Sequence, residues 1–121
     1  MAVKIGDSGL NIIQLSGQID LSNSVEIKRQ IAKAIVSKQY AAILVDMERV
    51  ESIDSEGLLM LVAAFRHAQK RQLRLSICSI APSIRMVFEL TQVDRVFEIF
   101  ENRHAFAKSL KPREQVLQLI A

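Results

Sequence analysis

Ser55 stands between two carboxylates, Asp54 and Glu56, after one apolar stretch of the chain and before another. A hydroxyl in this setting can accept a phosphate or act as a nucleophile. If a helix starts here, Asp54 or Ser55 is its natural N-cap, and a phosphate would lie at the positive end of its dipole. Beside two carboxylates, the same phosphate would repel an acidic or apolar partner. The residues therefore indicate either a phosphorylation switch for protein binding or a serine that only caps a helix.

A hydrolytic use of Ser55 would need a histidine within hydrogen-bonding reach. His67 lies twelve residues downstream, which is roughly 18 Å along a helix that rises about 1.5 Å per residue. The sequence has no Gly-x-Ser-x-Gly turn to expose a serine nucleophile and no glycine-rich phosphate loop. We therefore predict that the chain is not an enzyme and uses no cofactor. A serine-nucleophile enzyme stays open as a remote alternative.

A string of acidic residues leads into the Ser55 turn: Asp46, Glu48, Glu51, Asp54 and Glu56. Carboxylates can hold a divalent cation, but the spacing is not that of an EF-hand loop. On a strand, moreover, alternate side chains point to opposite faces. We expect a solvated acidic loop and no metal site.

The residues after Ser55 predict an amphipathic helix. Gly57 has no side chain, which would let the backbone of a partner approach. Helical spacing predicts a buried stripe at Leu58, Leu61, Val62 and Phe65. The opposite face carries apolar residues where lysine and glutamate are usual: Met60, Ala63 and Ala64. We interpret this face as a reversible docking surface; the alternative is that a neighbouring helix, starting at Pro82, covers part of it.

The composition fits a single small domain over residues 1–121, with 13.6 kDa and half of its residues hydrophobic. No apolar run approaches the ~20 residues that cross a bilayer, and the N-terminus has no export signal, so we expect a cytoplasmic protein without membrane insertion. Cys78 is the single cysteine, which excludes an internal disulfide. The net charge is only +3, and acidic and basic residues are interspersed. With one tyrosine and no tryptophan, the chain also offers little for base stacking, so we expect no direct nucleic-acid binding.

Hydropathy predicts short strands that alternate with helices. The expected strands cover residues 2–5, 10–16, 41–47, 73–78 and 96–100. One helix is expected from a cap at Ser22 or Ser24 to about Ser37. Others are expected to start at Asp54 or Ser55, at Pro82, and near Asn102 or Arg103. The predicted fold class is an α/β sandwich with a four- to five-stranded mixed sheet and about four helices. Residues 110–121, which include Pro112, are expected to dock as a final helical turn, or to form a partner-binding tail.

Four segments resemble the STAS domain of bacterial anti-sigma factor antagonists, in order and over nearly the whole chain. They are Gly17-Gln18-Ile19-Asp20, the apolar strand that ends in Asp46, Asp54-Ser55-x-Gly57-Leu58, and the stretch from Ser79 to Phe88. The Asp-Ser-x-Gly-Leu segment is the specific part of the resemblance.

The resemblance implies that Ser55 is the phosphoacceptor and that Asp20 lies near it on the docking surface. It also implies a partner serine kinase that doubles as the anti-sigma factor, binds the unphosphorylated form and is released on phosphorylation. A PP2C-type phosphatase would reverse the change. Glu56 departs from the family, which usually has serine or threonine there, and this departure could select a different partner. The alternative is a constitutive STAS scaffold or accessory subunit of a sensory or transport assembly.

Overall fold

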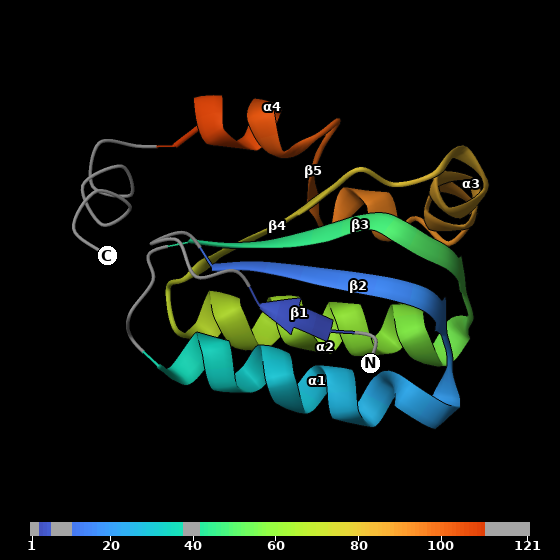
Figure 1. The fold of residues 1–121 in the computed structure, drawn as a ribbon, viewed down its shortest axis with the longest axis horizontal. Coiled ribbons are helices and arrows are strands. Elements are labelled where there is room, and N and C mark those ends of the chain that lie inside the picture. Colours follow the sequence, from blue (N-terminus) through green and yellow to red (C-terminus); the bar gives the residue numbers. More distant parts are fainter. Residues whose placement is uncertain (1–2, 6–10, 38–41, 111–121) are drawn as a thin grey trace.

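The structure is a computed structural model that describes residues 3–5, 11–37 and 42–110. The chain begins with two strands, after which helices and strands alternate (Figure 1). The elements are β1 (Val3–Ile5), β2 (Asn11–Ile19), α1 (Leu21–Val36), β3 (Ala42–Ile53), α2 (Ser55–Lys70), β4 (Arg74–Cys78), α3 (Pro82–Leu90), a 3-10 turn (Val93–Arg95), β5 (Glu98–Phe100) and α4 (Arg103–Lys108).

The five strands form one sheet in the order β1-β2-β3-β4-β5. The β1 strand pairs antiparallel with β2, and the remaining neighbours are parallel. Helices α1 and α2 lie side by side on one face of the sheet, and α4 lies on the other (Figure 1). The predicted α/β class is confirmed, with a mixed sheet and four α-helices in the described part of the chain.

Each face of the sheet has its own hydrophobic core. The larger core joins the sheet to α1, α2 and α3 through buried residues such as Ile31, Leu61 and Phe88. The smaller one lies under α4 and consists of Ala42, Leu44, Cys78, Phe106 and Leu110. A strand covered on both faces reads as a continuous apolar run, which explains why residues 42–47 of β3 are all buried.

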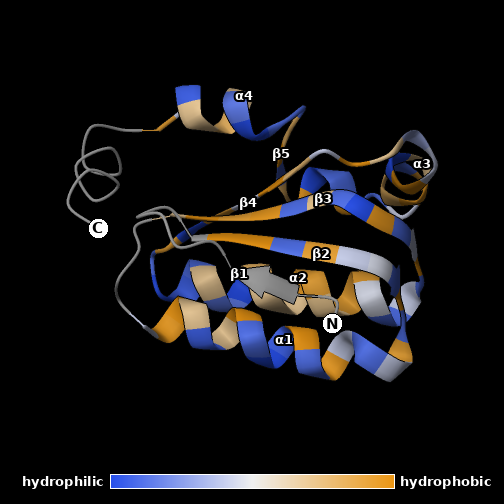
Figure 2. Ribbon diagram, viewed as in Figure 1, coloured by the Kyte–Doolittle hydropathy of each residue, from blue (hydrophilic) through white to orange (hydrophobic). Residues whose placement is uncertain are grey.

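Strand β3 is longer than the sequence predicted, because it continues past its apolar run to Ile53. Figure 2 shows the change from hydrophobic to hydrophilic residues along it. Glu48 and Glu51 therefore lie on an exposed strand segment, not in a loop. The register against β2 shifts twice over this segment, and each shift inserts one extra residue into β3. Such bulges bend and twist a strand, and here they lie in the second half of β3, just before α2 begins.

Other element boundaries also differ from prediction. Asp20, and neither Ser22 nor Ser24, caps α1. The last strand begins at Glu98, two residues later than predicted, and a 3-10 turn at Val93–Arg95 precedes it. Leu110 is buried against the smaller core, and the rest of the expected C-terminal segment, residues 111–121, lies outside the described residues.

Arg74 joins α4 to the edge of the sheet. Its guanidinium makes an ion pair with Glu98, with 2.7 Å between Nε and Oε1. The same group lies 5.1 Å from the ring centroid of Phe106 and donates a hydrogen bond to Ser109 Oγ at 2.7 Å. These contacts hold α4 against the face of the sheet opposite α1 and α2.

Candidate functional site

Two helices begin side by side at the carboxyl edge of the parallel strands. The last paired residues of β2 and β3 are Ile19 and Ile53, which face each other in the parallel register. The next residue of each strand, Asp20 and Asp54, caps the helix that follows. The backbone N–H of Asp54 donates to the carbonyl of Ile19 at 3.0 Å, which ties the two helix starts together. The edge therefore presents two positive helix ends next to each other.

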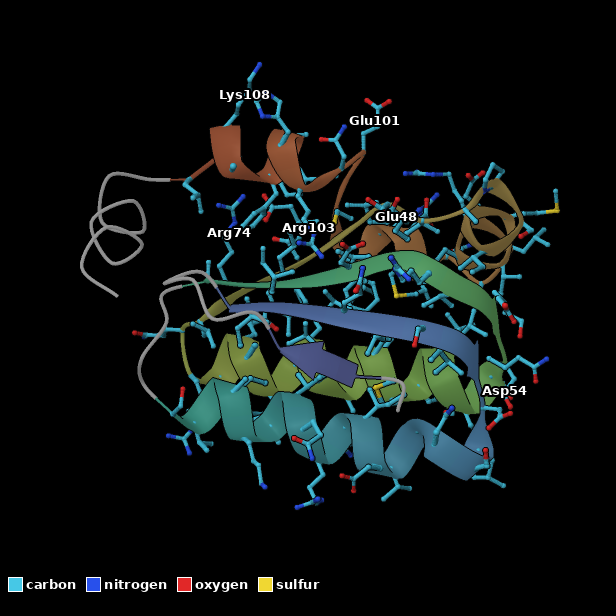
Figure 3. All side chains as sticks on the ribbon, viewed as in Figure 1. Glu48, Asp54, Arg74, Glu101, Arg103 and Lys108 are labelled. Carbon is cyan, nitrogen blue, oxygen red and sulfur yellow. The ribbon has the colours of Figure 1, made fainter. Side chains whose placement is uncertain are left out.

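Asp54 is the N-cap of α2. Of the two caps that the sequence allowed, Asp54 and Ser55, the structure therefore has the first. Its backbone is extended, and its Oδ1 accepts a hydrogen bond from the N–H of Gly57 at 2.9 Å. Figure 3 shows the Asp54 side chain at the end of the helix. Ser55 is then the first helical residue, and it is exposed, as is Glu56 after it. No hydrogen bond of the Ser55 hydroxyl to any described residue is present, so the oxygen is available to a partner or an enzyme.

The start of α1 uses the same aspartate cap but leaves no such hydroxyl. Asp20 Oδ1 accepts from the backbone N–H of Ser22 at 2.9 Å and also from the Ser22 hydroxyl. In the opposite direction, the backbone N–H of Asp20 donates to Asn23 Oδ1 at 3.0 Å, and the two bonds form a capping box. The serine of this helix start is thus engaged internally, whereas Ser55 is not.

Gly57 serves the interior of the protein, and the prediction that it admits the backbone of a partner is wrong. It is buried, and a Cβ atom there would lie 2.7 Å from Ile53 Cγ1 and 3.0 Å from Ile19 Cγ2. It would also lie 3.1 Å from the Ile19 carbonyl oxygen. Only glycine lets the first turn of α2 pack this close to the ends of β2 and β3.

Part of the predicted docking face is also wrong. Met60 and Ala64 are buried, and Ala63 is half-buried. The helix that packs along α2 is α1, not the helix that starts at Pro82. Met60 and Ala64 therefore belong to the larger core, which is why no lysine or glutamate occupies these positions, whereas a role of Ala63 in docking stays a prediction.

The sequence reasoning missed three exposed apolar residues in the first two turns of α1 and α2: Leu21, Val25 and Leu59. Leu59 follows Ser55 by one helical turn, and Val25 follows Leu21 by one turn on α1. The i, i+4 spacing from Ser55 was a usable signal for Leu59. Leu21 could be found only after Asp20 was known to be the cap.

The edge around Ser55 is acidic. Asp20, Asp54 and Glu56 form no ion pair with any basic side chain among the residues that the structure describes. Within the same residues, no group of three or more metal-binding side chains gathers, and no helix is long and apolar enough to span a bilayer. The site thus offers an available hydroxyl, uncompensated carboxylates and exposed apolar side chains.

The sequence model of the STAS domain family matches residues 2–106 of the chain. The chain belongs to the STAS domain family. A relative in Listeria monocytogenes, an anti-sigma-B factor antagonist, is 28% identical over 87 residues, covering 72% of this chain and 75% of its own.

Two solved structures share the fold of this STAS domain. An anti-sigma factor antagonist from Mycobacterium paratuberculosis superposes with a TM-score of 0.72 at 25% identity, covering 88% of this chain and 89% of its own. The Bacillus cell fate determinant SpoIIAA in its phosphorylated form gives a TM-score of 0.66 at 19% identity, covering 89% and 97%.

Proposed function

We propose that this STAS domain is an anti-sigma factor antagonist switched by phosphorylation of Ser55. With Ser55 unmodified, the domain binds a serine kinase that is also the anti-sigma factor; with Ser55 phosphorylated, it releases that partner. The observation that carries the proposal is the exposed hydroxyl at the first position of α2, which has no hydrogen bond among the described residues. The names of the relatives support the antagonist role.

The local chemistry explains how one phosphate would change binding without unfolding the domain. At the first turn of α2, the added negative charge meets the positive end of the helix dipole, so the fold tolerates it. Toward a partner, the phosphate adds about −1.5 to −2 charges to an edge that already holds Asp54 and Glu56. A surface that docks on the apolar neighbours of Ser55 would then have to desolvate a dense anionic group. A PP2C-type phosphatase would restore the binding form.

A binding experiment with three variants tests the switch. The anti-sigma kinases encoded in the source genome are purified and titrated separately against the wild type, Ser55→Ala and Ser55→Asp by isothermal calorimetry. We expect Ser55→Ala to bind like the wild type and to stay bound when ATP is added. We expect Ser55→Asp to bind at least about a hundredfold more weakly, since an unpaired charge buried at an interface costs about 3 kcal/mol or more.

Ser83 supplies the matched control, because it is an exposed serine in the first turn of another helix, α3. Ser83→Asp adds the same charge at the same kind of position and should leave affinity within about twofold. Equal binding by Ser55→Ala and Ser55→Asp would contradict the switch.

One observation favours a second function, a constitutive scaffold within a larger assembly. Glu56 places a fixed negative charge next to Ser55, where the resemblance leads us to expect a serine or threonine. Mass spectrometry of the protein from its own cells separates the two functions. Trypsin releases Val50 to Arg66, in which Ser52 and Ser55 are the only hydroxyl residues. Phosphate on Ser55 that varies with growth condition supports the switch, and a peptide that is always unmodified supports the scaffold.

A further inference from the structure

Exposed apolar side chains gather next to the helix starts at the Ser55 edge. On α1, Leu21 and Val25 keep 66% and 73% of their surface exposed, and on α2, Leu59 keeps 63%. Solvent-facing positions at helix starts usually carry polar residues, so three large apolar side chains here need an explanation. They are not core residues, unlike Met60 and the other members of the larger core.

The fold brings these three side chains to one end of the molecule. Leu21 and Ser55 are the first residues of α1 and α2, and Val25 and Leu59 lie one turn further along. The two helices follow neighbouring parallel strands and pack side by side (Figure 1). Equivalent positions of the two helices therefore lie at the same edge of the sheet, so the three apolar side chains are at the same end of the helix pair as the serine.

Glu56 differs from the other two acids of this edge, because its carboxylate makes no side-chain hydrogen bond or ion pair within the described residues. Asp20 and Asp54 each accept a capping hydrogen bond from a backbone N–H, at 2.9 Å in each case. Glu56 is exposed, and neither a capping bond nor an ion pair to a described residue engages it. A surface that covered the apolar side chains would also desolvate this carboxylate, which is unfavourable unless the surface supplies a cation.

From these observations we infer that Leu21, Val25, Glu56 and Leu59 form one docking face, and that Glu56 selects a protein partner with a lysine or arginine beside an apolar patch. The inference rests on the proposed function and names the chemistry of its partner. An acidic partner surface, or an anionic lipid surface, would be repelled by this edge. In a two-fold symmetric pair of copies meeting at this face, the acidic edges would face each other, so a second copy fits less well.

Charge substitutions test the selection. The kinase that binds the wild type is immobilised, and association and dissociation rates are measured by surface plasmon resonance at about 50 mM and about 300 mM NaCl. We expect Glu56→Lys to slow association about tenfold or more at low salt, and Glu56→Gln to slow it about threefold. Both differences should shrink at high salt, because a shorter Debye length screens exposed charges. Glu101→Lys is the matched control, since Glu101 is an exposed acid near the start of α4 (Figure 3).

A second pair of variants tests the apolar part of the face. Leu59→Ser should raise the dissociation constant about tenfold, as expected when a buried leucine is lost from an interface. Val36→Ser removes an exposed apolar side chain from the far end of α1 and should leave binding unchanged. Both variants alter exposed positions, so circular dichroism should show the wild-type fold.

The outcomes separate this inference from the proposed function. If a kinase binds the wild type but binds Glu56→Lys equally well, the inference is overturned and the antagonist function stands. If no kinase binds the wild type, both fail together. A wild-type dimer in light scattering that Leu59→Ser dissolves would assign the face to a second copy, and would also overturn the inference.

Discussion

The middle of strand β3 and the residues directly after its end hold polar clusters of opposite character. Toward its middle, Asp46 has no exposed surface; its carboxylate accepts from the Glu48 N–H at 3.0 Å and from Arg103 Nε at 2.6 Å. Cys78 pairs with Asp46 in the register of β4 and is also buried. Directly after Ile53, the last residue of the strand, Asp54 and Ser55 are exposed. Figure 3 shows Arg103 on the α4 side of the sheet and Asp54 at the edge.

The difference shows which polar groups are structural and which are available for binding. A buried polar group must find its hydrogen-bond partners inside the protein. The buried cluster does so, and in the process it joins β3 to α4 across 57 residues of sequence. The exposed cluster satisfies only its capping bonds and keeps a hydroxyl and a carboxylate for other molecules. Substitutions in the first should therefore change stability, and substitutions in the second should change binding.

The largest expected effect is the protection of Cys78. Burial, and to a smaller extent the nearby charge of Asp46, raise the pKa of its thiol from 9.0 to about 11. Only the thiolate reacts with disulfide reagents, so labelling of the native protein by Ellman's reagent at pH 8 should be at least about a hundredfold slower than in urea. Prompt labelling of the native protein would show that the cluster is open to solvent.

The same shift makes stability depend on pH. Between pH 9 and about 11 the thiol of the unfolded chain ionises while the folded thiol stays neutral. The unfolded state thus binds fewer protons, and stability falls as pH rises through this window. Cys78→Ala should lose this part of the pH dependence, which can be measured by urea unfolding at several pH values.

The next largest effect is expected for Arg103→Ala. The substitution leaves the buried carboxylate of Asp46 without its charged partner, although half of the Arg103 side chain (49%) is exposed and water can partly replace it. We expect a loss of about 2–3 kcal/mol in the free energy of unfolding, measured in urea. Lys108→Ala, an exposed position on the same helix, should cost less than about 0.5 kcal/mol. If Ser55→Ala costs as much as Arg103→Ala, the distinction between the two clusters is wrong.

Local chemistry made much of the fold predictable. The apolar run of residues 42–47 and the alternation around Cys78 identify strands by periodicity, and Pro82 marks the start of α3. The start of α2 was also predictable, because an N-cap depends on residues only three positions apart. These signals sufficed to place Ser55 at the first turn of a helix.

Contacts between distant segments were not predictable in the same way. Periodicity shows that Met60 and Ala64 are apolar, but it does not show that α1 covers them. The pairing of Asp46 with Arg103 depends on how α4 returns to the sheet. The length of β3 was missed because its second half carries exposed acids on a strand whose first half is buried.

Gly57→Ala should have a smaller effect than the changes at Cys78 and Arg103. It tests whether Gly57 packs inside the domain or contacts a partner. In a helix, alanine is about 1 kcal/mol better than glycine, so a free surface position would gain stability. Here the new Cβ would lie 2.7 Å from Ile53 Cγ1, and relief of that overlap requires β3 or α2 to shift. We expect a net loss of about 1–2 kcal/mol in urea unfolding.

Ala63→Gly, at a half-buried position of the same helix, is the companion variant and should lose about 1 kcal/mol from propensity alone. If Gly57→Ala is more stable than the wild type and binds the partner more weakly, Gly57 belongs to the docking surface after all. A stability loss in both variants shows that Gly57 holds Ser55 in place from within. The cap of α2, the close approach of Gly57 to β3 and the exposure of the hydroxyl would then be consequences of one local packing arrangement.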